Sequence, residues 1–161
     1  RKGGEALAPV NMGDALASSL SMMEPQLRHR QVQITRILPE DDVWVMGDQL
    51  RIEQVMVNLL RNALDATKSV SEPEVEIILA AGETASLTVR DNGTGIEELE
   101  SLFEPFYTTK QPGDGVGLGL AISSGIVNGL GGRLIARNAR ERGAVFEMQL
   151  PILEDDVEAA E

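Results

Sequence analysis

Hydrophobic and polar residues change their spacing along this chain, and the changes divide it into helices and strands. Asn11 is placed to cap a helix that runs to about residue 31, and Asp48 to cap a second helix that runs to about residue 67. Apolar residues at helical spacing predict a third helix over about residues 120–130. Alternating or short apolar runs predict strands over residues 32–38, 43–46, 75–80, 86–90, 133–138 and 144–150.

The order of these elements predicts the architecture. Strands that arrive as hairpins, with helices between the pairs, favour one sheet with its helices on one face. We therefore expect an α/β sandwich in which a mixed sheet of about five strands carries three main helices on one face. Residues 1–6 look like a linker, residues 7–151 are expected to form one domain, and residues 152–161 form an acidic tail whose composition predicts disorder.

Composition narrows the classes of function. The 161 residues fit one domain, and the absence of cysteine excludes disulfides and thiolate metal sites. One histidine cannot form a cluster of imidazole ligands, and a net charge of −12 argues against nucleic-acid binding. No apolar run approaches the roughly 20 residues that span a membrane. A cytosolic domain without membrane contact is therefore expected, although its parent protein could be anchored in a membrane.

The helix that begins after Asp48 carries the most informative polar residues. Gln54, Asn58 and Asn62 lie four residues apart and form a stripe on a helix that is otherwise mostly apolar. A buried amide without a partner costs about 1–3 kcal/mol, and a hydrated cation with phosphates would supply such partners. Mg²⁺ prefers oxygen ligands, so an amide oxygen suits it. The alternative is a polar stripe that faces solvent.

Two glycine-rich segments follow. Asp91, with Gly93 and Gly95 behind it, comes directly after a strand, where a carboxylate could accept a hydrogen bond from an exocyclic amine such as that of adenine. The same residues also suit an ordinary turn. Residues 113–119 lead into a helix, so their backbone N–H groups could bind phosphate, with Lys110 nearby. A dinucleotide-binding fingerprint is disfavoured, because these glycines alternate and follow a loop rather than a strand.

Together, in this order, these motifs resemble the catalytic domain of sensor histidine kinases, within the wider GHKL ATPase superfamily of gyrase, MutL and the large heat-shock chaperone. The resemblance covers residues 7–151 and looks closest to the dicarboxylate-transport and nitrogen-regulation sensor kinases. The segments that match are 54–66 (the N box), 91–95 (the first glycine box), 103–110 (the F box), 115–120 (the second glycine box) and the last strand, 143–151.

This resemblance implies a Bergerat ATP-binding fold with roles for particular residues. Asn58 and Asn62 would hold Mg²⁺ and act in catalysis with Lys110, and Asp91 would bind the adenine amino group. The other residues implied in ATP binding are Ala66, Gly93, Gly95, Ile96, Phe106, Gly115, Val116, Gly117, Leu118 and Gly119. The chain departs from many members at Ala144, where they carry a hydroxyl residue beside the aspartate.

The resemblance also implies partners. The phosphoacceptor histidine would lie in a separate dimerising hairpin, expected upstream of Arg1, and the phosphoryl group would pass on to a response regulator. The domain itself would be monomeric and would lie on the cytosolic side of an inner-membrane sensor. His29 is expected to be a surface residue near a helix end, and Trp44 to be a packing residue. Two alternatives stay open: a serine kinase of the anti-sigma type, and a degenerate domain that serves only as an interaction module.

Overall fold

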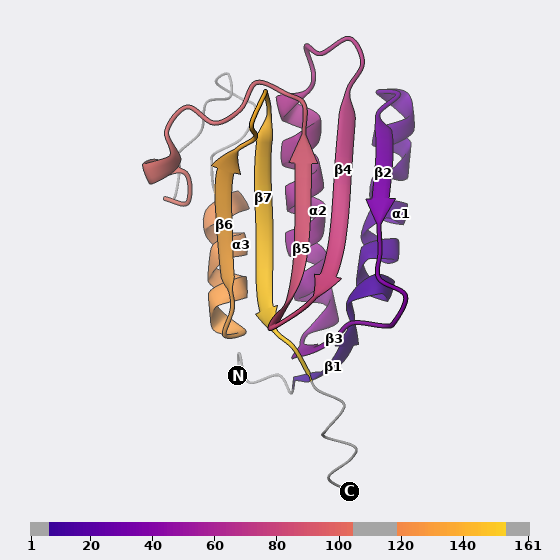
Figure 1. Ribbon diagram of the computed structural model, residues 1–161, viewed down its shortest axis with the longest axis vertical. Helices are drawn as coiled ribbons and strands as arrows, with labels where there is room; N and C mark the ends of the chain where they lie inside the picture. The colour runs from indigo at the N-terminus through magenta and orange to yellow at the C-terminus, as the bar shows by residue number, and fades with distance from the viewer. Residues whose placement is uncertain (1–6, 105–118, 154–161) are drawn as a thin grey trace, which may run out of the picture.

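The computed structural model describes residues 7–104 and 119–153, which form a sheet backed by helices (Figure 1). The helices are α1 (Met12–His29), α2 (Gln49–Ala66) and α3 (Gly119–Gly129), with the short 3-10 helix η1 (Leu99–Ser101). The strands are β1 (Ala8–Asn11), β2 (Gln33–Ile37), β3 (Trp44–Gly47), β4 (Glu74–Ala81), β5 (Thr84–Asp91), β6 (Arg133–Asn138) and β7 (Ala144–Pro151).

The main sheet has five strands in the order β2-β4-β5-β7-β6. β2 runs parallel to β4, whereas the other neighbours are antiparallel, so the sheet is mixed. α1, α2 and α3 all lie behind one face of this sheet, and the other face is open (Figure 1). The predicted two-layer sandwich is therefore confirmed.

The apolar periods of the sequence explain which side of each element is buried. In β4 and β5 every second residue faces the helices, as in the cross-strand pair Ile77 and Val89, and both are buried. α2 contributes the largest helical share of the core, through Ile52, Val55, Met56, Leu59, Leu60, Ala63 and Leu64. Within the two described ranges, no helix is long and apolar enough to cross a membrane.

Both predicted helix caps are present. The Asn11 Oδ1 accepts hydrogen bonds from the backbone N–H groups of Gly13 and Asp14, at 2.9 and 3.3 Å. The Asp48 Oδ1 accepts from the N–H groups of Leu50 and Arg51 in the same way, at 3.1 and 3.4 Å. Each cap satisfies donors that the first turn of a helix leaves unpaired, which explains why α1 and α2 begin where the sequence predicts.

The two ends of the domain contain structure that the sequence did not indicate. Before α1, β1 pairs antiparallel with β3 in a separate two-stranded sheet, so the predicted strand 43–46 lies outside the main sheet. After β7, Ile152 bridges to Val45 and the Leu153 N–H donates to the Trp44 carbonyl at 2.8 Å, so the chain keeps contact with β3 for two residues past the predicted boundary at residue 151. β1 has a proline and too few residues to show a period, so only its pairing with β3 makes it a strand.

Trp44 was expected to be a packing residue, and this was wrong. Successive side chains of β3 alternate between the two faces, so Val45 is buried and Trp44 keeps 37% of its surface exposed. Alternation alone did not say which of the two faces meets the core. His29, in contrast, is exposed as the last residue of α1, as predicted.

Candidate functional site

Asn58 and Asn62 lie in the C-terminal half of α2, which ends at the loop that follows β5. The Ala66 carbonyl at the end of α2 accepts a hydrogen bond from the Thr94 N–H at 3.3 Å. Asn62 lies one helical turn before Ala66, and the loop begins directly after Asp91. The structure therefore places Asn62 and Asp91 at the same end of the sheet, on either side of this contact.

Asn58 is held by α3. Its Nδ2 donates to the Ser123 Oγ at 3.1 Å, and Ser123 lies one turn inside α3. Gly119 begins α3 so close to this amide that a Cβ there would lie 2.5 Å from the Asn58 Oδ1. Gly119 therefore lets the N-terminus of α3 approach the asparagine, which gives the last glycine of the second motif a packing reason.

Asn62 has an unusual environment for an amide. Its Nδ2 is buried and has no hydrogen-bond partner within the described ranges. Its Oδ1 accepts no hydrogen bond from those residues either. An unpaired buried donor costs about 1–3 kcal/mol, so this position is not explained by stability. A ligand with oxygen atoms or a cation would give the amide the partners it lacks.

The side-chain oxygen atoms at this site are too few to hold a cation alone, so they suit a cation that has further oxygen ligands from water or phosphate. Residues 7–104 and 119–153 contain no group of three or more acidic, histidine or cysteine side chains that could hold a metal ion. An Mg²⁺ ion takes oxygen ligands, keeps several waters and shares the oxygens of a substrate phosphate. The amide oxygens of Asn58 and Asn62 therefore fit Mg²⁺ bound to a phosphate, and they do not form a metal cage of their own.

Asp91 is a buried carboxylate at the end of β5, with 4% of its surface exposed. Its Oδ1 accepts from the backbone N–H groups of Gly93 at 2.8 Å and Ala144 at 3.3 Å. Burial raises the pKa of Asp91 above its ordinary value, and the two backbone hydrogen bonds oppose that rise. The hydrogen bonds to this carboxylate from the described part of the chain all go to Oδ1, so Oδ2 is available to a donor such as an exocyclic amine.

Two glycines allow the backbone to close around this aspartate. Gly143 has a φ of +97°, and a Cβ there would lie 1.8 Å from the Asp91 carbonyl oxygen. A Cβ at Gly93 would lie 2.3 Å from the carbonyl oxygen of Ala66. Gly93 and Ala66, both predicted site residues, are therefore in direct contact. A side chain at Gly93 would push the loop away from α2, and one at Gly143 would push β7 away from Asp91.

Asn138, which the sequence did not indicate, fixes the far end of the loop. Its Oδ1 accepts from the Ile96 N–H at 2.7 Å, and its Nδ2 donates to the Ile96 carbonyl at 3.1 Å. Gly95 precedes this clamp with a φ of +87°. Gly95 and Ile96, which were predicted to bind ATP at its base, thus lie against the end of β6, at the same end of the sheet as Asp91.

Two cavities lie near these residues. The larger, of about 460 Å³, lies among α1, α2 and α3, and its lining includes Asn58, Gly119 and Ser123. The smaller, of about 90 Å³, includes Asp91 and Asn92. Neither cavity contains both Asn62 and Asp91, so the contact of Ala66 with Gly93 is what relates the two. Gln54, the first residue of the predicted stripe, is exposed in the larger cavity.

A family comparison agrees with this geometry. Residues 47–154 match the model of the histidine kinase-, DNA gyrase B- and HSP90-like ATPase family. This segment begins just before α2 and ends after β7, so it includes Asn58, Asn62 and Asp91. The chain belongs to this ATPase family.

Named relatives and solved structures place the chain more closely. It is 39% identical to the C4-dicarboxylate transport sensor protein DctB of Pseudomonas aeruginosa, over 88% of this chain and 24% of DctB. It superposes on the catalytic domain of histidine kinase ThkA with a TM-score of 0.80 and 28% identity, covering 91% and 98% of the two chains. ThkA in complex with the response regulator TrrA matches with a TM-score of 0.78 and 27% identity, over 91% of this chain and 42% of that one. The predicted resemblance to sensor kinases, including a dicarboxylate-transport sensor, is confirmed.

Several residues that were predicted for this ATPase site lie outside the described residues. They are Phe106, Lys110, Gly115, Val116, Gly117 and Leu118. Their roles remain predictions. The predicted site residues that the structure describes lie in α2, in the loop after β5 and at the start of α3.

Replacing Asn138 with alanine should weaken nucleotide binding by this ATPase domain. The change removes both hydrogen bonds to Ile96, and each such bond contributes about 1 kcal/mol, so we expect the dissociation constant of an ATP analogue to rise about fivefold or more. Calorimetric titration measures this. Asn128→Ala, at an exposed position of α3, is the matched control and should leave the affinity unchanged. Equal affinities for the two variants would show that Ile96 and its clamp do not contribute to the base pocket.

Asp91→Asn should weaken nucleotide binding and strengthen folding at neutral pH. The amide Oδ1 can still accept from Gly93 and Ala144, but the second group becomes a donor, so we expect a loss of about 1–3 kcal/mol in affinity for ATP. The raised pKa of Asp91 means that its stability contribution is complete at low pH and is lost as pH rises from the ordinary value of 3.8 through the folded-state pKa.

An asparagine at position 91 does not ionise, so it does not lose stability as the pH rises. The free energy of unfolding of Asp91→Asn, relative to the parent, should therefore increase with pH across this window. Denaturant titrations at several pH values measure it, with the exposed Asp14→Asn as control. A relative stability that stays flat or falls with pH would contradict the assignment of a desolvated carboxylate.

Proposed function

We propose that this domain binds ATP with Mg²⁺ and transfers the γ-phosphate to a histidine in a helical hairpin of the same sensor kinase, for relay to a response-regulator aspartate. The observation that carries the proposal is the position of Asn62. Its side-chain amide has no partner within the described ranges, and it lies one turn from the contact between α2 and the loop after Asp91. The ATPase family match and the complex of ThkA with a response regulator support the nucleotide and the relay, respectively.

Each residue has a role that follows from its surroundings. The Asp91 Oδ2 would accept a hydrogen bond from the adenine amino group, and Asn138 would hold Ile96 beside the base. Asn62 and Asn58 would hold Mg²⁺, and Ser123 would keep the Asn58 amide oriented. The metal ion, when bound, neutralises charge on the phosphates. The protein therefore contributes positioning and a fixed polar environment rather than a nucleophile.

The acceptor must come from outside the described residues of the site. The chain has a single histidine, and His29 is exposed at the end of α1 rather than beside Asn58 or Asn62. DctB has about three quarters of its length outside the match, because this chain covers 24% of it. A hairpin in that remaining part would supply the histidine. We place the domain on the cytosolic side of a membrane-anchored sensor, and we expect it to be monomeric by itself.

The larger cavity indicates the side from which the hairpin approaches. Met22, Leu50 and Ile122 are exposed apolar residues of its lining, which also includes Asn58 and Gly119. Exposed apolar side chains beside polar ones are typical of a protein-binding surface. An apolar face of the acceptor hairpin could pack there with its histidine near phosphates held at Asn58.

Ile122→Asp should therefore reduce phosphoryl transfer without reducing nucleotide affinity. An interface residue of this kind contributes about 2 kcal/mol, so we expect transfer to the hairpin to fall more than about tenfold. Ile37→Asp is the matched control, because Ile37 and Ile122 have the same exposed fraction, 47%, and Ile37 lies on β2. Radiolabel transfer and calorimetry measure the two properties. Unchanged transfer by Ile122→Asp would remove this cavity from the docking site.

The proposed reaction is tested by mixing this domain with the separately made hairpin of its parent kinase and ATP labelled at the γ-phosphate. We expect label on the hairpin that is lost in acid and kept in base, as for phosphohistidine. Acid-stable label on serine would favour the anti-sigma-type alternative. No label, with no Mg²⁺-dependent binding of an ATP analogue, would favour a domain that serves only in interactions.

A further inference from the structure

The two-stranded sheet of β1 and β3 exposes an apolar surface that the nucleotide site does not use. Pro9 lies opposite Met46 in the register, Trp44 lies two residues from Met46 on the same side of β3, and Leu7 directly precedes β1. Leu7, Trp44 and Met46 keep 50%, 37% and 42% of their surfaces exposed. We call Leu7, Pro9, Trp44 and Met46 the ribbon face.

The opposite side of the same two strands reaches the core through one pair of valines. Val10 and Val45 lie opposite each other and belong to the hydrophobic core. A strand that faces a core on one side usually carries polar residues on the other, whereas strands covered on both sides are apolar on both. The ribbon face therefore has the composition of a surface that another element covers.

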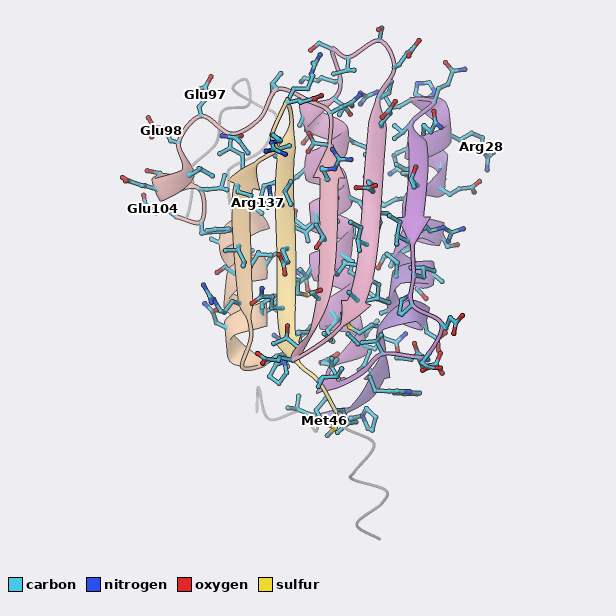
Figure 2. The ribbon with its side chains drawn as sticks, in the orientation of Figure 1. Arg28, Met46, Glu97, Glu98, Glu104 and Arg137 are labelled. Carbon is cyan, nitrogen blue, oxygen red and sulfur yellow. The ribbon has the colours of Figure 1, made fainter. Side chains whose placement is uncertain are left out.

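The position of the ribbon face identifies the segment that can cover it. Figure 1 shows β1 and β3 at the lower end of the molecule, where the described chain both begins and ends. The Leu153 N–H donates to the Trp44 carbonyl, so both ends lie against β3 or its partner strand. Figure 2 shows Met46 at this end, directed away from the main sheet. Polypeptide that continues from either end therefore leaves beside the ribbon face.

The two directions differ in chemistry. Residues 154–161 are Glu-Asp-Asp-Val-Glu-Ala-Ala-Glu, which suit water better than an apolar surface. The upstream direction enters through Leu7 and Pro9, which are part of the ribbon face. This chain covers 24% of DctB, so that relative has further sequence outside the match. The upstream segment is the better occupant.

We propose that the ribbon face is a docking surface for the apolar base of the helical hairpin that precedes this domain in the sensor kinase. The proposal rests on the proposed function for the existence of that hairpin. It assigns the hairpin a second contact, at the opposite end of the sheet from Asp91 (Figure 1).

A hairpin docked here would act directly on the helices of the site. β1 ends at Asn11, which caps α1, and β3 is followed at once by Asp48, which caps α2. α2 then carries Asn58 and Asn62. Movement of the ribbon face would therefore shift the first turns of α1 and α2 directly, because the capping residues Asn11 and Asp48 join them to β1 and β3.

Hydroxyl-radical labelling tests the docking in the full-length kinase against this domain alone. Trp44 and Met46 react readily and are resolved by mass spectrometry. The buried centre of an interface excludes solvent, so we expect their labelling to fall about threefold or more in the full-length protein. Ile37, 47% exposed on β2, is the internal control and should be labelled equally in both. Equal labelling of Trp44 and Met46 in the two proteins would overturn the proposal.

Met46→Asp in the full-length kinase should release the contact and return the labelling of Trp44 to that of the isolated domain, whereas Ile37→Asp should not. If Met46→Asp fails to fold, which loss of ATP-analogue binding reveals, Trp44→Ser with Met46 as the reporter replaces it. Protection that appears in the isolated domain as its concentration rises would identify a second copy as the occupant and overturn the proposal. Labelling uses no ATP, so a failure here is distinct from a failure of phosphoryl transfer.

Discussion

Replacing Asn62 with alanine is expected to lower phosphorylation of the acceptor hairpin by about 100-fold while leaving the domain folded. The loss in rate follows because the amide oxygen is proposed to hold Mg²⁺ against the phosphates, and weakening metal coordination typically costs about 10–100-fold. The folded state should tolerate the change, because the buried Nδ2 has no partner among residues 7–104 and 119–153 and stabilises nothing there.

This combination separates a functional asparagine from a structural one. The rate of label transfer and the free energy of unfolding are measured for Asn62→Ala and for Asn128→Ala, which changes an exposed asparagine of α3. We expect the free energy of unfolding of both variants to remain within about 1 kcal/mol of the parent, as is usual for a change that removes no favourable contact. Full activity in Asn62→Ala, or a loss of activity that merely follows a loss of stability, would count against the metal assignment.

Gly143→Ala is expected to have the largest effect on stability. A Cβ at this position would lie 1.8 Å from the Asp91 carbonyl oxygen, and the φ of +97° is one that alanine rarely adopts. The end of β7 must therefore move away from β5, and we expect a loss of roughly 3 kcal/mol or more in the free energy of unfolding. Because the Ala144 N–H would move with it, nucleotide affinity should fall as well.

Gly125→Ala is the control for this variant. No atom lies within 4 Å of a Cβ built at Gly125, which is exposed on α3. Alanine favours a helix over glycine by about 1 kcal/mol, so this variant should be slightly more stable than the parent. Denaturant titration compares the two. A Gly143→Ala protein as stable as the parent would mean that the close approach of the backbone around Asp91 is not a constraint.

Local chemistry explains what the sequence alone could predict. Asn11 and Asp48 cap α1 and α2 through contacts within three residues, so their signals are present in short stretches of sequence. The alternation in β4 and β5 likewise follows from which residues face α2. Asn58, Asn62 and Asp91 could be predicted as site residues because evenly spaced amides and neighbouring glycines mark them in the sequence.

The remaining parts depend on contacts between distant residues. Ser123 hydrogen-bonds to Asn58, which is 65 residues away in the sequence, and Asn138 hydrogen-bonds to Ile96, which is 42 residues away. Nothing in the residues next to Ser123 or Asn138 therefore distinguishes them from ordinary polar residues. β1 becomes a strand only because β3 pairs with it. The same pairing turns Trp44 outward, against the expectation that it packs inside. Tertiary placement, rather than propensity, decides these positions.

The most direct test of the proposed site uses Mn²⁺ in place of Mg²⁺, because both ions prefer oxygen ligands. A paramagnetic ion broadens the nuclear magnetic resonance signals of the groups around it. We expect Mn²⁺ with an ATP analogue to remove the side-chain amide signals of Asn62 and Asn58, while Mg²⁺ with the same analogue leaves them visible. Sharp Asn62 signals in a protein saturated with the Mn²⁺ complex would contradict the account.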